Sequence, residues 1–194
     1  MKRILCFVII CSFISCKEQK KQQRYLPDSN AKINHLTVVM PKKSWSGALG
    51  ETTRSLLETP YEGLPFDEPQ FSLQYMPPIA FTGFARNSRN VLWFVNDSIG
   101  GFQLAEDYMA KPQVVARVMG EDDDVQAFYL EENIALFKAT LTAAEQKEKI
   151  RRIKKSPAKA SKLRERFQVN LTYPTAYNTV KDTTNFVWIQ KDTP

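Results

Sequence analysis

Apolar and polar positions alternate over much of the chain after residue 32, a pattern typical of strands. Over residues 33–40, Leu36, Val38 and Met40 fall on one face and the intervening side chains on the other. The same reasoning, with turn-forming residues as boundaries, predicts further strands. These cover residues 71–76, 90–95, 102–108, 114–119, 169–173 and 185–190.

Helical spacing replaces alternation after Pro41. An apolar stripe that includes Leu49 and Leu56 predicts a helix over residues 44–58. Gly47 and Gly50 each cost such a helix about 1 kcal/mol relative to alanine. Their presence indicates close approach of another backbone or a kinked first turn.

The longest predicted helix occupies the second half of the chain. It begins at Asp122 or Asp123, either of which can cap it, and ends before Pro157. Its apolar stripe consists of Ala127, Leu130, Ile134, Phe137, Leu141 and Ala144. A short helix over 158–167 is expected to follow.

This order of elements predicts an α+β fold. We expect a mainly antiparallel sheet with two or three helices packed on one face, one of them the long helix. Residues 32–194 are predicted to form a single domain, preceded by a polar, flexible tether over residues 16–31.

The first 15 residues have the features of an exported leader. Met1-Lys2-Arg3 is followed by an apolar run of 11 residues ending at Ile14, and then by a small residue, Ser15. A membrane-spanning helix needs roughly 20 apolar residues, so the run predicts a cleaved signal rather than an anchor helix. A plain secretory signal is the alternative interpretation.

Cys16 follows directly and is the expected acyl acceptor of a bacterial lipoprotein. Acyl chains on its sulfur would hold the protein on the outer membrane, facing the periplasm by default. Lys17-Glu18 partly matches a surface-export signal, so the cell surface is a second expected location. Cys6 and Cys11 would leave with the leader, so no disulfide or cysteine metal site is expected.

Charge is concentrated late in the chain, whose formal net charge is +6. Residues 145–166 include ten basic and three acidic residues. A solvated helix face is the favoured interpretation. The alternative is binding to an anionic surface such as lipid head groups, and nucleic acid is not expected in this compartment. The candidate residues are Lys147, Arg151, Arg152, Lys154, Lys155, Lys159 and Lys162.

Candidate chemistry is sparse. The single histidine, His35, lies in a predicted strand without an indicated partner, and no phosphate loop, nucleophile elbow or zinc-protease motif occurs. No catalytic residue, metal ligand or cofactor is therefore predicted. Asp67 or Glu68 could hydrolyse a glycan if it met a second acid across a cleft. The candidates for that second acid are Glu131 and Glu132.

Aromatic residues allow two interpretations, because strand alternation buries some rings while others could line a groove for a glycan or peptide. Alternation favours the core. The residues concerned are Trp45, Trp93, Trp188, Phe66, Phe71, Phe94 and Phe186.

Three segments carry a resemblance to a known family: residues 63–71 (GLPFDEPQF), 110–113 (AKPQ) and 185–189 (NFVWI). In this order they resemble an uncharacterised lipoprotein family of Bacteroidetes-type bacteria, of which the chain would be a shortened member or a fragment. The resemblance implies a lipoprotein and no catalytic residue. We therefore expect a lipid-anchored cell-envelope protein that binds or scaffolds an envelope protein or glycan without catalysis. A glycan or cell-wall hydrolase is the alternative.

Overall fold

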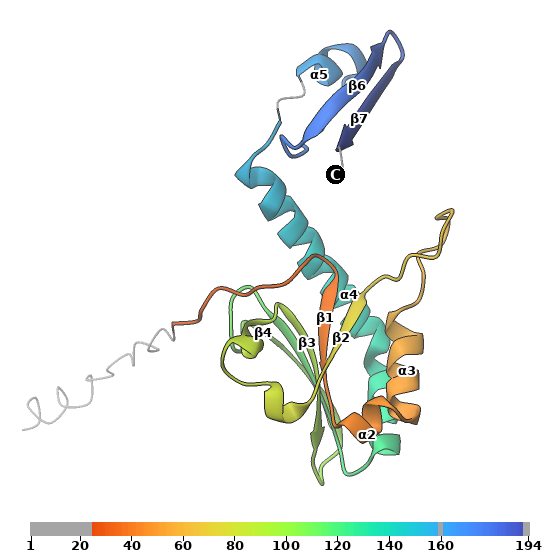
Figure 1. Cartoon of the computed structure of the whole chain (residues 1–194), viewed down its shortest axis with the longest axis vertical. Coiled ribbons are helices and arrows are strands. Elements are labelled where there is room, and N and C mark those ends of the chain that lie inside the picture. The colour runs from red at the N-terminus through yellow and green to blue at the C-terminus, as the bar shows by residue number, and fades with distance from the viewer. Residues whose placement is uncertain (1–24, 159–160, 192–194) are drawn as a thin grey trace, which may run out of the picture.

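A five-stranded sheet forms the centre of the computed structural model, which describes residues 25–158 and 161–191 (Figure 1). The strands lie in the order β2-β1-β3-β5-β4. Their bounds are β1 His35–Val39, β2 Ser72–Met76, β3 Asn90–Asn96, β4 Gly101–Glu106 and β5 Val114–Gly120.

The mixed class of the fold, with helices and strands in one unit, is confirmed, but the expected antiparallel pairing is wrong for this sheet. β1 runs parallel to both β2 and β3, and β3 runs parallel to β5. The pair β4–β5 is antiparallel. The reason lies in the connections, because α3 links β1 to β2 and two short helices link β2 to β3. Each crossover brings the chain back to the end of the sheet at which the previous strand began, so the next strand runs parallel to it.

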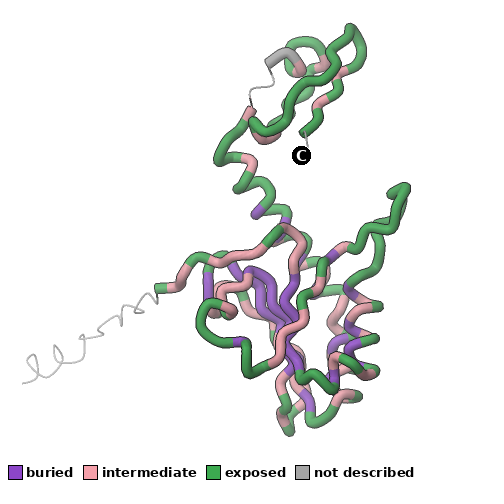
Figure 2. Tube along the Cα trace, viewed as in Figure 1, coloured by how far each residue is buried: buried purple, intermediate pink, exposed green. Residues whose placement is uncertain are grey.

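Helices α2 (Lys42–Trp45), α3 (Ala48–Leu57) and α4 (Asp123–Lys155) pack on one face of the sheet (Figure 1). Leu36 and Val38 of β1 and Met40, which follows the strand, are fully buried in the core beneath these helices. The 3₁₀ helices η2 (Pro78–Ala80) and η3 (Gly83–Asn87) cover part of the other face. Its smaller core consists of Val39, Phe81, Val91 and Val115. Figure 2 shows the buried residues concentrated along the central strands.

The predicted helix over 44–58 is split in two, because Ser46 and Gly47 separate α2 from α3. A Cβ on Gly50 would lie 2.0 Å from the carbonyl oxygen of Trp45. Of the two alternatives expected from these glycines, the close backbone approach is confirmed at Gly50, and the break between α2 and α3 lies at Gly47. Only glycine leaves room for the α2 backbone at position 50.

The last described residues, 156–158 and 161–191, form a small unit that we call the C-terminal module. It contains α5 (Ser161–Phe167) and a hairpin of β6 (Tyr177–Thr183) and β7 (Phe186–Lys191). The predicted strand over 169–173 is wrong, because β7 pairs with the more polar segment 177–183 through a tight turn instead. The module stands apart from the sheet at the far end of α4 (Figure 1).

The tether ends earlier than predicted. Ser29 N–H donates to the Lys111 carbonyl at 2.9 Å, and Asn30 N–H donates to the Asn87 carbonyl at 2.8 Å. Residues 28–31 are thereby attached to the domain, which begins before Lys32. Backbone pairing of this kind has no signature in a polar sequence.

None of the helices in the described ranges is both long enough and apolar enough to cross a bilayer.

Candidate functional site

The carboxyl ends of β1 and β3 border a cleft of about 650 Å³, which we call the carboxyl-edge cleft. From β1 the chain crosses one face of the sheet through α3 to reach β2 on one side. From β2 it crosses the other face through η2 and η3 to reach β3 on the other side. The connections diverge between β1 and β3, which is where open parallel sheets usually bind ligands.

Side chains from four segments line the carboxyl-edge cleft. They are Pro41, Lys43 and Ser44 after β1, Pro78 in η2, Trp93 to Asn96 in β3, and Glu121 to Asp124 with Gln126 at the start of α4. Ser44 Oγ donates to Asp123 Oδ1 at 2.8 Å and joins α2 to α4. Gln126 Nε2 donates to the carbonyls of Val95 and Gly120, at 3.1 and 3.2 Å. These hydrogen bonds hold α2, α4 and the ends of β3 and β5 together around the carboxyl-edge cleft.

The start of α4 confirms the predicted cap. Asp122 Oδ1 accepts a hydrogen bond of 2.9 Å from Val125 N–H. Gly120 allows this helix to follow β5 directly, because a Cβ there would lie 2.9 Å from Val125 Cγ1. The lining contains four carboxylates, at residues 121–124, and one ammonium, that of Lys43. This excess of negative charge disfavours anionic ligands.

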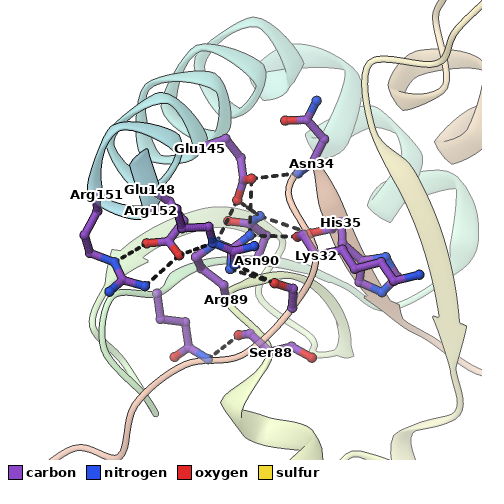
Figure 3. Close-up of polar contacts among 12 residues, drawn as sticks. Lys32, Asn34, His35, Ser88, Arg89, Asn90, Glu145, Glu148, Arg151 and Arg152 are labelled. Carbon is purple, nitrogen blue, oxygen red and sulfur yellow. Dashed lines mark hydrogen bonds and ion pairs between the residues drawn. The ribbon is translucent and has the colours of Figure 1, made fainter. Parts of the chain in front are cut away.

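A second polar cluster lies at the opposite, amino-terminal edge of the sheet and is centred on Glu145 of α4 (Figure 3). Its carboxylate accepts from Arg89 Nε at 2.8 Å, from Asn90 Nδ2 at 2.7 Å and from Asn34 N–H at 2.6 Å. The Glu145 and Arg89 side chains are 2% and 3% exposed. This buried ion pair attaches α4 to the segments that precede β1 and β3.

Glu148, one turn further along α4, is bound by two arginines (Figure 3). Arg151 donates to both of its oxygens at 2.6 and 2.8 Å, and Arg152 Nε donates at 2.7 Å. Arg152 also donates to the Ala31 carbonyl at 2.8 Å, and Arg89 donates to the same carbonyl at 3.1 Å. The cluster therefore fastens the N-terminal segment of the domain to α4.

Sequence reasoning missed this cluster, although a signal exists. Glu145 and Glu148 continue the spacing of the buried stripe of α4 after Leu141. An ionisable residue at a stripe position requires a buried partner. The partner itself, Arg89, is 56 residues away and could not be identified from spacing alone.

Both carboxyl groups have lowered pKa values. Burial raises the pKa of Glu145, but hydrogen bonds from Arg89, Asn34 and Asn90 outweigh it. Hydrogen bonds from Arg151 and Arg152 lower the pKa of Glu148 to about 2 against the effect of burial. The cluster is thus held in its ionised form near neutral pH.

A carboxylate with a lowered pKa stabilises the fold above its unfolded value of 4.5 and loses this effect as the pH falls towards its native value. We therefore expect the free energy of unfolding to decrease as the pH is lowered from about 5 to about 2. The decrease should be shallower in Glu148→Gln. Urea unfolding across this range measures it, and equal slopes in the two proteins would contradict the assignment.

The structure distributes the predicted basic surface over two environments. Lys147, Lys154 and Lys155 are exposed near the end of α4, whereas Arg151 and Arg152 bind Glu148. Lys162 belongs to α5. Lys159 and the acyl acceptor Cys16 lie outside the described residues. Of the five candidates whose side chains the structure describes, Arg151 and Arg152 have an ion-pair partner within the chain.

The candidate acids of the hydrolase alternative are all exposed. Asp67 and Glu68 lie in the loop between α3 and β2, and Glu131 and Glu132 lie on the outer side of α4. None of the four lines the carboxyl-edge cleft. His35 Nε2 shares a hydrogen bond of 2.8 Å with Gln74 Oε1 across β1 and β2.

The aromatic residues divide between core and surface. Phe71 and Phe94 are buried in the main core, and Trp45 stacks on Tyr75 with ring centroids 5.3 Å apart. Trp93 packs edge-on against Phe81 and also lines the carboxyl-edge cleft. Phe66, Phe186 and Trp188 are exposed. None of these three lines the carboxyl-edge cleft.

Among the described residues, no group of three or more histidine, cysteine, aspartate or glutamate side chains is arranged to hold a metal ion. Comparison with known proteins finds one family model, described as a domain of unknown function (DUF8532), which matches residues 29–154. No curated protein and no solved structure matches the chain. The matched range contains the whole sheet, the carboxyl-edge cleft and nearly all of α4, and it stops before the C-terminal module.

Proposed function

The chain belongs to the DUF8532 family, and we propose that it is a lipid-anchored protein of the bacterial cell envelope that binds a small ligand in the carboxyl-edge cleft without catalysis. The observation that supports binding most strongly is the position of this cleft at the point where the strand connections diverge. The leader and Cys16 support the location.

The lining of the cleft suggests the chemistry of its ligand. Trp93, Pro41 and Pro78 provide apolar surface, while the carboxylates at residues 121–124 provide acceptors. Such a surface suits a neutral or cationic ligand that carries hydrogen-bond donors. Short glycans and amines of the envelope have this chemistry, whereas free phosphate does not.

Binding can be tested by thermal shift with a panel of short oligosaccharides, amino acids and amines, with inorganic phosphate as the negative probe. We expect at least one neutral or cationic member to raise the Tm of the native chain. Asn96→Trp, which fills the mouth of the cleft, should abolish that shift, and Glu132→Trp on exposed α4 should preserve it. A panel without any stabilising member, or a shift that Asn96→Trp leaves intact, would contradict the proposal.

A further inference from the structure

An extended loop and the C-terminal module project from the same end of the molecule (Figure 1). The loop, residues 58–71, joins α3 to the amino end of β2. Helix α4 starts at the carboxyl edge and passes Asn34 and Arg89, which precede β1 and β3, before it reaches the module. Both projections therefore extend beyond the amino-terminal edge of the sheet.

The loop is acidic and apolar. Its base is closed by hydrogen bonds of 3.1 Å between Tyr61 N–H and the Glu68 carbonyl, and between Gln70 N–H and the Thr59 carbonyl. Leu64 and Phe66 at its tip are exposed, Phe66 by 78%. It carries four carboxylates, Glu58, Glu62, Asp67 and Glu68, and no lysine or arginine. A closed loop that presents apolar side chains to solvent is typical of a contact surface.

The hairpin of the C-terminal module has two different faces. Its register places Trp188 opposite Lys181 and Phe186 opposite Thr183 on one face, while Val187 lies opposite Asp182 on the other. Arg166 of α5 donates to Asp182 and to the Thr183 carbonyl, which ties α5 to the hairpin. Val187 is partly buried, but Phe186 and Trp188 are 50% and 49% exposed.

Helix α5 supports the hairpin, but the face of Phe186 and Trp188 stays exposed, and such an apolar face suits a partner that covers it. Further large apolar side chains are exposed in the module: Val169, Leu171, Tyr177 and Val180. The module and the end of α4 are strongly basic, through Lys154, Lys155, Arg164, Lys181 and Lys191 among others. The charge is opposite to that of the loop.

From these two surfaces we infer that a second copy of the chain docks here, the loop of each copy lying on the C-terminal module of the other. A two-fold contact requires a self-complementary surface. The loop and the module provide one, since each is apolar and their charges are opposite. A cavity of about 310 Å³ between Tyr61 of the loop and Lys149 of α4 adds a concave element to the same region.

The same surfaces argue against an anionic bilayer as the occupant of the module face. The loop carboxylates extend beyond the same edge of the sheet and would be repelled by anionic head groups. A second copy covers the apolar side chains of the loop and of the module in a single contact. This inference is independent of the ligand proposed for the carboxyl-edge cleft.

Sedimentation analysis of the unacylated chain from residue 17, which keeps every described helix and strand, tests the inference. We expect a concentration-dependent dimer. Phe66→Asp and Trp188→Asp should each weaken it by roughly thirtyfold or more, the effect of losing a central interface residue. Phe84→Asp is the matched control, because Phe84 is 77% exposed on η3, away from both surfaces.

A charge exchange provides the second arm. One chain carries Glu62→Lys, Asp67→Lys and Glu68→Lys in the loop, and another carries Lys154→Glu, Lys155→Glu and Lys181→Glu. In the first chain the loop becomes basic like the module, and in the second chain residues 154–191 lose their net positive charge and no longer attract the acidic loop. Each alone should therefore dimerise much more weakly than the native chain. The mixture should form a heterodimer, because the acidic loop of the second chain still meets the basic module of the first. Circular dichroism confirms that the variants are folded.

Three results would overturn the inference. They are a native chain that stays monomeric, a dimer insensitive to both Phe66→Asp and Trp188→Asp, and a mixture of the charge-exchanged chains that does not associate. Binding of a monomer to phosphatidylglycerol vesicles through Trp188 would assign the face to lipid instead.

Discussion

Glu145→Gln is expected to lower the free energy of unfolding by about 3–5 kcal/mol, the usual consequence of removing one partner from a buried ion pair. Arg89 is 3% exposed, so its guanidinium cannot regain water when the carboxylate is lost. The substitution also weakens the acceptor for Asn34 N–H and Asn90 Nδ2. Urea unfolding at pH 7, followed by circular dichroism, measures the change.

The matched control is Glu132→Gln, the same chemical change at an exposed position of α4. It should alter the free energy of unfolding by no more than about 0.5 kcal/mol. A second comparison uses the double variant Glu145→Met/Arg89→Met, which removes both charges. It should be more stable than Glu145→Gln, because no buried charge is left without a partner. Equal effects of Glu145→Gln and Glu132→Gln would show that the cluster contributes little to stability.

Gly50→Ala is the second substitution with a large expected effect. Alanine favours a helix by about 1 kcal/mol over glycine, so propensity alone predicts stabilisation. The new Cβ would lie 2.0, 2.5 and 2.8 Å from the O, C and Cα atoms of Trp45, and these backbone atoms cannot move without shifting α2. We expect a net destabilisation of about 1–3 kcal/mol, as for other overpacked sites.

Thermal unfolding measures this effect, with Ser55→Ala on the exposed side of α3 as the control. Because α2 carries Ser44 of the carboxyl-edge cleft, Gly50→Ala should also lower the affinity for any ligand that the thermal-shift panel identifies. Stabilisation by Gly50→Ala would mean that the α2–α3 junction relaxes more easily than its packing indicates.

Most elements could be predicted because their signals are local. The stripe from Leu130 to Leu141 predicted α4, and the acidic residues before it predicted a cap at Asp122 or Asp123, of which the structure selects Asp122. Gly47 and Gly50 indicated a close backbone approach or a kinked turn, since glycine in a helix interior needs a structural cause. That the approaching backbone is the one at Trp45 emerged only from the structure. The strands β1 to β5 were predicted from alternation within a few residues of their bounds.

Strand direction and the two sites could not be predicted, because both depend on contacts between distant segments. Parallel pairing of β1 with β3 is decided by how η2 and η3 cross the sheet, and these short helices have no periodic signal. The carboxyl-edge cleft exists only because β1 and β3 are neighbours with diverging connections. Arg89 and Glu145 likewise meet only after α4 folds back over the sheet.

The C-terminal module shows a third limit. Its strand β6 has the sequence YNTVKDT, with every residue exposed, so no buried face imposes alternation on it. Pairing with β7 selects this segment instead of the more apolar 169–173. A strand without a core gives little sequence signal.

Mass spectrometry of the N-terminal peptide of the native protein, extracted from bacterial envelopes with detergent, tests the proposed lipid anchor. We predict a peptide that begins at Cys16 and carries the mass of acyl chains on its sulfur. A peptide that still contains residues 1–15, or an unmodified Cys16, would contradict it.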